Sequence, residues 1–501
     1  HEGHIFLPKQ NLLEKSIQIL CTQESENLEE RTLFSLDHLI EINKIISQDG
    51  FYYLPHLHQA EKGIANWIKG SLPQKNRKRL KDPLHEIECF AEKRSLNFSE
   101  EQLEAMLDAL KTRIFVLTGG PGTGKTTTLQ GMLFLFRQSK LRVKLAAPTG
   151  RAARRMSEVC ETEAFTLHRL LEFTPGEYPP FLRHEGNQLK CDVLVLDEAS
   201  MVDAPLFYAL LQALPKTASI IIVGDQDQLP SVGPGNVLRE LLKVPTIPHC
   251  ILKTIFRQSD ENDIPHNAHR IQKGLMPEFK NNTQFHFRGY DSIADAQQKI
   301  YNLASKNLPE HFGFDPFMDI QILVPMHKGP LGIEELNKGL QARLNPNGKA
   351  VMLQGRLFKQ GDKVMQLRNN YEKSIFNGDV GIITKIKENS KQIIVDFGEQ
   401  ITIEYSECDQ LTLAYACSIH KSQGSEYKAA ILILDSSHHI MLQRNLLYTG
   451  VTRAKERVFL VAQMSAIETA IQNNHMQKRY TQLSEIIDRG SEFLDFLAEV
   501  D

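Results

Sequence analysis

The chain has 501 residues, 41% of them hydrophobic, which is enough for about three to four domains of roughly 150 residues, each with a real core. Lysine plus arginine total 58 against 61 aspartate plus glutamate, a net charge of -3, so overall charge cannot be what holds this chain to nucleic acid or membrane. The seven cysteines form no C-x-x-C pair, which argues against a zinc module or a disulfide framework. No apolar run approaches the roughly 20 residues that span a bilayer, so we expect no membrane partner and a cytoplasmic location.

The first part of the chain has the apolar spacing of helices. Apolar residues recur every three or four positions, as at Leu36, Leu39 and Ile42, so residues 1–96 are predicted to form a helical N-terminal domain. A basic run at residues 75–81 is either a solvated face or a patch that contacts DNA. The chain begins at His1 rather than Met, which leaves open whether an N-terminal extension is missing.

From residue 97 onward, short β-rich runs alternate with helical patterns, which is typical of α/β architecture with parallel sheets. The runs form two groups, which predicts two α/β units. Between the groups, five short β-branched or aromatic runs within residues 355–406 predict an inserted β-barrel. The strands predicted for the α/β units are Ile114–Thr118, Val143–Ala147, Val193–Leu196, Ile220–Val223, Ile320–Val324, Ala430–Leu434 and Val458–Ala462.

A glycine-rich segment after the first of these strands matches the phosphate-binding pattern G-x-x-x-x-G-K-[ST] and precedes a helical pattern. Glycines let successive backbone amides point at phosphate oxygens, and a helix N-terminus adds positive potential. We therefore expect Lys125 to reach the β- and γ-phosphates and the Thr126 hydroxyl to hold Mg²⁺. The predicted nucleotide-binding residues of this segment are Gly119, Gly120, Pro121, Gly122, Thr123, Gly124, Lys125, Thr126 and Thr127.

A buried strand, Val193–Leu196, ends in the carboxylates of Asp197 and Glu198. At a strand's carboxyl end, Asp197 can coordinate the metal's water shell, and Glu198 can orient or deprotonate an attacking water. The pair therefore favours ATP hydrolysis over nucleotide binding alone; capping of the next helix is the alternative.

Further motifs follow in a fixed order. They are Ala147–Met156, Thr166–Leu171, Asp197–Asp203, Gly224–Gly233, Phe256–Gln258, His420–Glu426 and Tyr448–Lys455. Together with the phosphate-binding loop they resemble the motifs of superfamily 1B DNA helicases of the RecD/TraA type, over about residues 97–463. Ser418 and Gly450 depart from the usual threonine and alanine, and neither change removes a reacting group.

This resemblance implies an α/β fold with two RecA-like P-loop NTPase domains in tandem. The first (1A) would span residues 97–255, with an insertion at 172–190 (1B) that is either a hairpin pin for the duplex fork or a plain surface loop. The second (2A) would span residues 256–354 and 407–480 around an SH3-like barrel (2B) at 355–406. Residues 481–501 would form a C-terminal helical tail.

The resemblance also implies roles around the nucleotide. Arg257 and Arg453 would reach the γ-phosphate, where a planar guanidinium suits bidentate contact, and Gln228 would sense that phosphate. Gln102 would read adenine, although Ser99-Glu100-Glu101-Gln102 is equally a helix capping box. The remaining implied contacts are base stacking by Phe256, the nucleotide-site glycine Gly424, and the ribose contact of Glu426.

Local charge points to a DNA track. Residues 140–157 carry six basic side chains and no acid, and single-strand binding needs cations along the backbone path. Charge reversal at Arg151 or Arg154 should weaken DNA binding, whereas the same change at Lys391 should do little. Capping or core packing remains the alternative for each predicted DNA contact: Pro148, Thr149, Gly150, Arg151, Arg154, Thr166, His168, His420, Lys421 and Ser422.

The combined prediction is an ATP- and Mg²⁺-dependent DNA helicase that moves 5′→3′ on single-stranded DNA and unwinds duplex at junctions, in DNA repair or recombination. The polarity follows from the resemblance alone. One alternative is an ATP-switch, DNA-binding subunit of a larger helicase–nuclease complex with little unwinding of its own. An RNA helicase is a third possibility, because no residue visibly tests for a 2′-hydroxyl.

Overall fold

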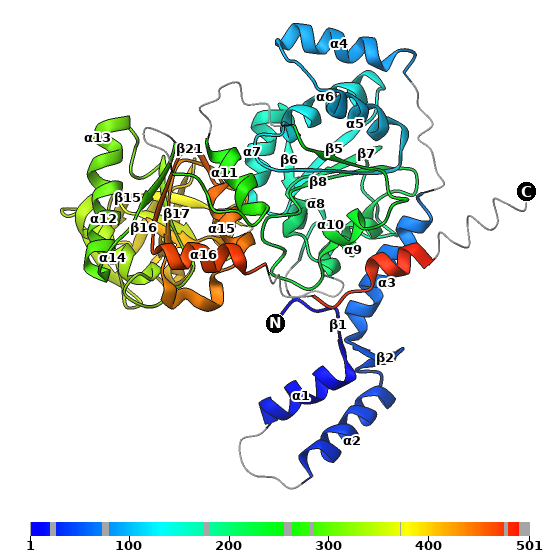
Figure 1. The fold of residues 1–501 in the computed structure, drawn as a ribbon, viewed down its shortest axis with the longest axis horizontal. Helices are drawn as coiled ribbons and strands as arrows, with labels where there is room; N and C mark the ends of the chain where they lie inside the picture. The colour runs from blue at the N-terminus through cyan, green and yellow to red at the C-terminus, as the bar shows by residue number, and fades with distance from the viewer. Residues whose placement is uncertain are drawn as a thin grey trace, which may run out of the picture.

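The structure is a computed structural model that describes residues 2–20, 27–72, 80–174, 176, 180–254, 263–279, 284–370, 372–474 and 479–489. Two α/β bodies lie side by side, and a pair of helices near the N-terminus projects from below them (Figure 1). In the described ranges, no helix is both long and apolar enough to cross a membrane.

The first α/β unit contains a six-stranded parallel sheet of order β6-β5-β7-β8-β4-β9. Alternate side chains of β8 enter two separate cores, Ile220 and Ile222 in one and Ile221 and Val223 in the other. Burial on both faces explains why the strands read as continuous apolar runs. The strands are β4 (Ile114–Gly119), β5 (Val143–Ala147), β6 (Ala164–Thr166), β7 (Val193–Leu196), β8 (Ser219–Gly224) and β9 (His249–Leu252).

Helices cover both faces of this sheet. One core takes side chains from α4 (Pro83–Arg94), α5 (Glu100–Lys111), α6 (Lys125–Gln138) and α7 (Gly150–Cys160). The other takes side chains from α3 (Pro55–Lys69), α8 (Leu167–Leu170), α9 (Ala204–Ala213) and α10 (Val237–Leu242). The carboxyl ends of β4, β7 and β8 are left to carry loops, which is where open α/β sheets bind ligands.

The second α/β unit has a five-stranded parallel sheet of order β10-β21-β20-β11-β19. Its strands are β10 (Phe285–Arg288), β11 (Ile320–Val324), β19 (Ala416–Ser418), β20 (Tyr427–Leu434) and β21 (Ala454–Ala462). One face packs on α11 (Asp263–Gln272), α15 (Arg444–Val451) and α16 (Met464–Gln472). The other packs on α12 (Ile293–Asn302), α13 (Leu308–Phe312) and α14 (Ile333–Leu344).

A small antiparallel β structure with its own core interrupts the second unit. Its five-stranded sheet has the order β17-β16-β15-β14-β18, and β12 pairs with β13 beside it. The seven strands exceed the five predicted, and they extend past residues 355–406 at both ends. They are β12 (Ala350–Leu353), β13 (Arg356–Lys359), β14 (Lys363–Gln366), β15 (Val380–Lys387), β16 (Gln392–Asp396), β17 (Gln400–Glu404) and β18 (Leu411–Leu413).

The N-terminal region differs from the helical domain that we predicted. It contains α1 (Lys9–Leu20) and α2 (Leu28–Glu41), but also an antiparallel sheet of β1 (Phe6–Pro8), β3 (Phe51–Tyr53) and β2 (Ile46–Gln48). Ile64 and Ile68 of α3 are fully buried in a core of the first α/β unit, and α4 lies on α6. The small sheet, α3 and α4 are therefore extensions of that unit, because their apolar residues are buried there, whereas α1 and α2 project from it (Figure 1).

Two further predicted segments are only partly described. The insertion at 172–190 has isolated antiparallel bridges, Phe173 to Phe181 and His184 to Asn187, but Pro175 and residues 177–179 lie outside the described residues, so the pin stays a prediction. The predicted tail is helical over 483–489, and Leu483 and Ile487 are buried in the first unit rather than free. Of the basic run at 75–81, only Leu80 and Lys81 are described.

Candidate active site

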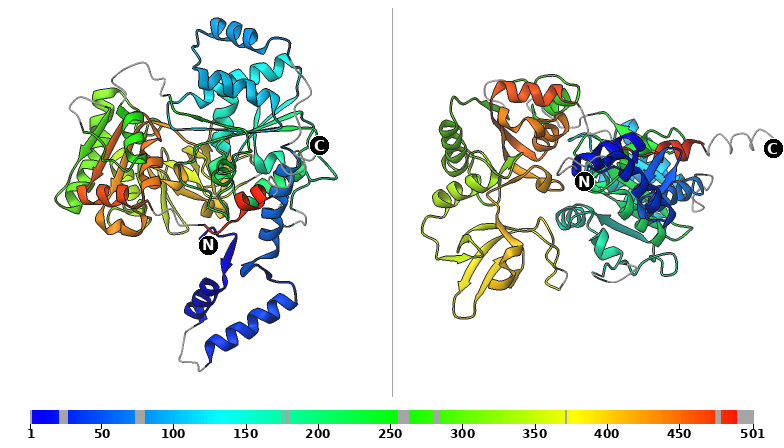
Figure 2. Two further views of the ribbon diagram at one scale, coloured as in Figure 1. Left: turned by 45° about the vertical axis from the view of Figure 1, so that its right-hand side comes forward. Right: turned by 90° about the horizontal axis from the view of Figure 1, so that it is seen from below.

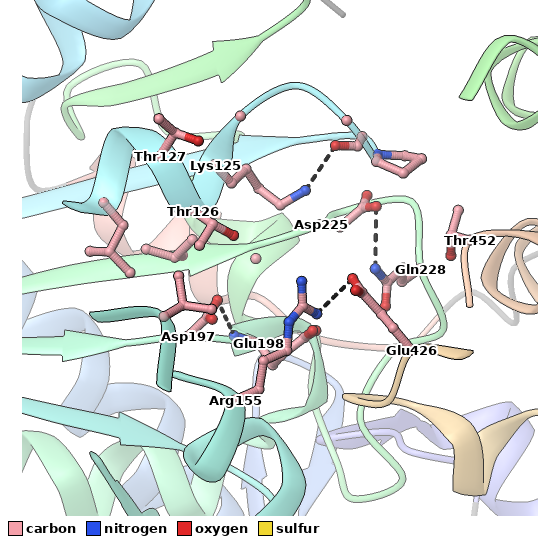
Figure 3. Close-up of a pocket in the computed structure, with 18 of the residues that line it drawn as sticks. Lys125, Thr126, Thr127, Arg155, Asp197, Glu198, Asp225, Gln228, Glu426 and Thr452 are labelled. Atoms are coloured by element: carbon pink, nitrogen blue, oxygen red, sulfur yellow. Dashed lines mark hydrogen bonds and ion pairs between the residues drawn. The ribbon is translucent and has the colours of Figure 1, made fainter. Parts of the chain in front are cut away.

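The phosphate-binding loop joins β4 to α6 and lines a cavity of about 350 Å³ between the two α/β units. Gly122 and Gly124 have φ values of +75° and +81°, which side chains rarely adopt. A Cβ at Gly119 would lie 2.9 Å from the Leu252 carbonyl oxygen. The Lys125 ammonium donates to the carbonyls of Gly119 at 2.5 Å and Gly120 at 2.9 Å, and so lies over the loop (Figure 3).

The two acids lie at the carboxyl end of β7 and face the same cavity (Figure 3). The Glu198 amide donates to Asp197 Oδ1 at 2.8 Å, and Glu198 has a left-handed φ of +51°, a strained conformation that is common at functional sites. Burial raises the pKa of Asp197, the charge of Glu198 raises it further, and Arg155 and Lys125 oppose the shift. A buried carboxylate of this kind gains most from a cation placed beside it.

The loop after β8 connects the cavity to the second unit. Asp225 Oδ2 accepts hydrogen bonds from the Tyr448 hydroxyl at 2.8 Å and from Gln228 Nε2 at 3.4 Å. Burial and Asp225 raise the pKa of Tyr448, so this phenol stays a donor. Gln228 Oε1 is buried and has no partner among the described residues. An unpartnered buried acceptor at the cavity wall fits a site that a ligand or its water completes.

The residue after Gln228 is fastened to the second unit from two sides. The Leu229 amide donates to Thr449 Oγ1 at 2.9 Å, and the Leu229 carbonyl accepts from Gln423 Nε2 at 2.9 Å. Thr449 belongs to α15. These two hydrogen bonds join the loop that carries Gln228 to the second unit.

The second unit contributes Arg453 to the cavity wall. Its buried guanidinium donates to the carbonyls of Thr449 at 3.1 Å and Ser425 at 3.2 Å, both within the same unit. The structure thus brings Lys125, Asp197, Glu198, Gln228 and Arg453 to one cavity. The predicted residues Phe256 and Arg257 lie outside the described residues.

Arg155 is a cavity residue to which sequence reasoning assigned no role there. It extends from α7 of the first unit, and its Nη1 lies 2.7 Å from Glu426 Oε1 of the second unit (Figure 3). Lys455 Nζ lies 3.4 Å from the other oxygen of Glu426. The carboxylate that we predicted to contact ribose is therefore held between two cations, one from each unit.

Comparisons with known proteins place this architecture in a family. An AAA domain model matches residues 102–234, the ATP-dependent RecD-like DNA helicase SH3 domain matches 336–397, and the UvrD-like helicase C-terminal domain matches 413–461. The chain is 30% identical to the RecBCD enzyme subunit RecD of Mycolicibacterium smegmatis, over 74% of this chain and 72% of that protein. The chain belongs to the RecD-like helicase family. The predicted family and the fold of tandem RecA-like domains with an SH3-like barrel are confirmed.

A second relative and a solved structure are also similar. The ATP-dependent RecD2 DNA helicase of Deinococcus radiodurans is 34% identical over 93% of this chain, and the chain spans 64% of that protein's length. Among solved structures, a Pif1 helicase from Candida albicans is similar with a TM-score of 0.47 and 18% identity, over 81% of this chain and all of that one.

Gln102 of this RecD-like chain takes part in the capping box that the sequence left as an alternative. Its Oε1 accepts from the Ser99 amide at 3.0 Å, and its own amide donates to Ser99 Oγ at 3.3 Å. Its Nε2 also points to the phosphate-binding loop, 3.4 Å from the Thr123 carbonyl. One buried side chain therefore caps α5 and contacts the loop, while the adenine contact stays a prediction.

Several predicted DNA contacts of the RecD-like chain are helix caps or core residues in this structure. Thr149 and Thr166 cap α7 and α8 through the amides of Ala152 and Arg169. The His168 ring packs edge-on to Phe173 at 5.3 Å between centroids, and burial lowers its pKa. The buried Ser422 hydroxyl donates to the Ile419 carbonyl at 2.8 Å. These are the alternatives that the sequence left open, and the DNA roles stay predictions.

The remaining predicted contacts lie at the junction of α7, the second unit and the barrel. Gly424 has a φ of +71°, and a Cβ there would lie 3.0 Å from Thr149 Oγ1. A Cβ at Gly150 would lie 3.1 Å from the Phe376 ring. Pro148 precedes α7, and the half-buried His420 and Lys421 both have pKa values lowered by burial.

The six basic side chains of residues 140–157 do not form the single open track that the sequence suggested. Arg142 pairs with Asp192 at 3.0 Å, and the Lys144 ammonium lies 4.8 Å from the Phe165 ring centroid. Arg151 donates to Ser425 Oγ at 2.8 Å and to the Tyr427 hydroxyl at 2.9 Å, so its charge reversal would disturb the junction of the two units. Sequence proximity placed these cations together, whereas β5 and α7 direct them to different neighbours.

Proposed function

We propose that this chain is an ATP-driven DNA helicase that moves 5′→3′ on single-stranded DNA and unwinds duplex at junctions. The observation that carries the proposal is the shared cavity: the first unit supplies Lys125 and the acid pair, the second supplies Arg453, and Leu229 is fastened to Thr449 across the boundary. ATP bound there would contact both units at once. Its hydrolysis would then change how the two units fit together, which is what a motor requires.

The residues of the first unit suit the phosphates of ATP. On binding, Lys125 would exchange the carbonyls of Gly119 and Gly120 for phosphate oxygens, while the loop amides and the N-terminus of α6 face the same anion. Thr126 and the buried Asp197 would hold Mg²⁺, which neutralises charge on the phosphates when bound. Glu198 would orient the attacking water and accept its proton.

The residues of the second unit would act on closure. Arg453 lies at the cavity wall on carbonyls of its own unit, and a turn toward the γ-phosphate would replace these neutral acceptors with an anion. Gln228 has its Oε1 without a partner among the described residues, which leaves it available to the γ-phosphate or its attacking water. Hydrolysis would thereby depend on the closed arrangement of the units.

The proposed substrate is DNA because the matching SH3 domain belongs to RecD-like DNA helicases and the Deinococcus radiodurans relative is itself a DNA helicase. The 5′→3′ direction, a role in repair or recombination, and a cytoplasmic location are parts of the proposal that rest on family membership.

ATP turnover with and without single-stranded DNA tests the motor. We expect DNA to raise turnover of the parent chain, and Lys125→Ala to lower it on the order of 10²- to 10³-fold, because the substitution removes a positioned cation from the phosphates. Lys111→Ala, an exposed lysine on α5, is the matched control and should turn over normally. A parent chain that DNA does not stimulate, or a Lys125→Ala variant with normal turnover, contradicts the proposal.

Unwinding of partial duplexes decides the polarity. Substrates that carry only a 5′ tail should be unwound, and those with only a 3′ tail should not. Competition between DNA and RNA oligomers of one sequence tests the choice of nucleic acid, and preferential binding of RNA would overturn it.

A second candidate is a DNA-binding subunit whose ATP site acts as a switch within a larger complex. It is favoured by the relatives named as RecD subunits of the RecBCD enzyme, such as that of Mycolicibacterium smegmatis. Strand displacement by a chain that elutes as a monomer on size exclusion would exclude it. ATP turnover without strand displacement would favour it.

A further inference from the structure

The loop of residues 229–235 follows Gln228 directly and runs from the nucleotide cavity to the outside of the molecule. Its first residue, Leu229, is fastened to the second unit. Ser231 is buried, but the next residue, Val232, is 81% exposed at the tip. Gly235 closes the loop with a φ of +93°. If Leu229 moves with the second unit, the exposed tip is displaced relative to the first unit only if the far end of the loop is fixed there.

Arg479 holds the far end through backbone groups. Its Nη1 donates to the carbonyls of Gly233 at 2.9 Å and Gly235 at 2.6 Å and to Ser231 Oγ at 3.1 Å. Its Nη2 donates to the Ser231 carbonyl at 2.5 Å. The planar guanidinium can reach several carbonyls at once, which a lysine cannot do. On the other side of the loop, a Cβ at Gly233 would lie 2.0 Å from Asp203 Oδ2, so the loop is clamped between Asp203 and Arg479.

The segment that carries Arg479 belongs to the first unit in space but follows the second unit in sequence. The Tyr480 carbonyl accepts from the Ile5 amide at 2.8 Å, and the Gln482 amide donates to the buried Glu61 at 2.8 Å. Figure 1 shows this red segment beside α3, away from α16. Leu483 and Ile487 anchor it in the core of the first unit.

The apolar anchors and Glu61 already attach the segment, so Arg479 is not needed for that purpose. Its guanidinium instead points at the loop, and Gly3 leaves room for it, because a Cβ at Gly3 would lie 2.5 Å from Arg479 Cζ. Burial lowers the pKa of Arg479, and the charge of Asp203 opposes that shift. The half-buried guanidinium thus makes its hydrogen bonds to a loop that begins at the nucleotide cavity.

We propose that Arg479 is a positioning residue of the motor: it holds the end of the 229–235 loop on the first unit, so that movement of Leu229 with the second unit displaces the exposed tip. This inference rests on the proposed function. Without Arg479 the whole loop would move with Leu229. The position of the tip relative to the rest of the loop would then no longer depend on whether nucleotide is bound.

The test compares Arg479→Gln and Arg479→Lys with Thr481→Val in the full chain. Thr481 donates to Glu61 in the same segment but has no bond to the loop, so its variant is the matched control. We measure amide hydrogen exchange of residues 229–235 with and without a non-hydrolysable ATP analogue, and ATP turnover with and without single-stranded DNA. Thermal unfolding verifies that each variant is folded.

We expect Arg479→Gln to remove the nucleotide-dependent change in exchange of the loop and to lower stimulation by DNA about tenfold, with the KM for ATP within about twofold, since hydrogen bonds from a charged donor are lost away from the nucleotide. The Arg479→Lys variant should retain part of the stimulation by DNA. The Thr481→Val control should retain all of it. Faster exchange with intact stimulation would overturn the proposal, because Arg479 would then be merely structural. An equal loss in Thr481→Val would also overturn it. A parent chain that DNA does not stimulate is the different result that defeats the proposed function itself.

Discussion

The structure changes the interpretation of Arg155. In the sequence it is one of six basic residues in an acid-free stretch, and no individual role was predicted for it. In the structure it points into the nucleotide cavity and pairs with Glu426 of the second unit at 2.7 Å. Its electric field also opposes the raised pKa of Asp197. Arg155 therefore connects the acid pair of one unit with the predicted ribose contact of the other.

Replacement of Arg155 by alanine should weaken ATP binding more than it slows turnover. Glu426 would lose the partner that orients it, and the cavity would lose a cation near the phosphates. We expect the KM for ATP to rise on the order of tenfold, from the loss of a charge-assisted pair across a partly buried boundary. Steady-state kinetics over a range of ATP concentrations measures this.

The control for Arg155 is Arg94→Ala, which removes an exposed arginine that pairs with Glu161 at 3.1 Å on the surface. Exposed pairs contribute little, so this variant should keep the parent KM. Arg155→Ala and Glu426→Gln should also be non-additive in a double-mutant cycle. Additive effects would mean that the two side chains act independently and would refute the cross-cavity role.

Sequence alone predicted which residues line the nucleotide cavity, because their spacing is set by local chain geometry. The phosphate-binding loop and the acids after β7 are contiguous, so a short pattern contains most of their arrangement. Arg155, Tyr448 and Thr449 were not predicted as site residues, because their roles depend on how two units meet. Thr149 and Thr166 carry a different ambiguity, since a hydroxyl before a helix is a cap in any protein.

At the scale of elements, α7 directs its arginines to two neighbours, the second unit and the barrel. Arg151 and Arg155 are four residues apart, which places them on one side of the helix, and both contact the second unit. Arg154 lies on another side. Its Nη1 donates to the Phe397 carbonyl of the barrel at 2.9 Å, and its Nη2 lies 3.7 Å from the buried Asp379. The helix therefore joins the first unit to both the second unit and the barrel.

Reversal of charge at Arg154 should weaken binding of single-stranded DNA about tenfold and reduce its salt dependence by about one phosphate contact, because a cation at the entrance between α7 and the barrel is lost. Lys391→Glu, in an exposed turn of the barrel, should do little. Anisotropy of a labelled oligomer across a salt series measures both quantities.

Asp379→Asn separates two explanations for Arg154. It weakens the docking of the barrel on α7 without removing a cation. If this variant reproduces the full loss seen with Arg154→Glu, Arg154 acts by holding the barrel and does not contact DNA. Equal losses for Arg154→Glu and Lys391→Glu would instead show a response to overall charge alone.

The elements that the sequence predicted are those with continuous apolar runs. The seven runs predicted for the α/β units correspond to β4, β5, β7, β8, β11, β20 and β21. The strands that were missed include β6, β9, β10 and β19, which are three or four residues long. Strands of this length are formed by their neighbours in the sheet, and a single sequence does not show which neighbours those are. The N-terminal sheet escaped prediction for the same reason.

At the scale of the molecule, the chain crosses between its two α/β units more often than its motif order suggests. Residues 263–279 and the barrel lie with the second unit, and the segment that carries Arg479 returns to the first (Figure 2). The near-neutral charge of -3 is consistent with this arrangement, since most cations of the predicted track have protein partners. Under the proposed function, communication between nucleotide and DNA would pass through contacts between the units.

Thr449→Val tests whether the bond to Leu229 carries that communication. The substitution keeps the shape of a fully buried side chain but removes the acceptor of the Leu229 amide. A buried donor without a partner costs about 1–3 kcal/mol. This cost destabilises the arrangement in which Leu229 and Thr449 are in contact. The difference in DNA affinity with and without a non-hydrolysable ATP analogue should therefore shrink on the order of tenfold or more, and by reciprocity DNA should change the analogue's affinity by the same reduced factor.

Thr469→Val, whose hydroxyl donates within α16, is the matched control and should leave both differences intact. If Thr449→Val retains the parent's nucleotide-dependent change in DNA affinity, the hydrogen bond to Leu229 is not needed for the coupling. The coupling would then run through other contacts between the units, such as the packing that valine preserves.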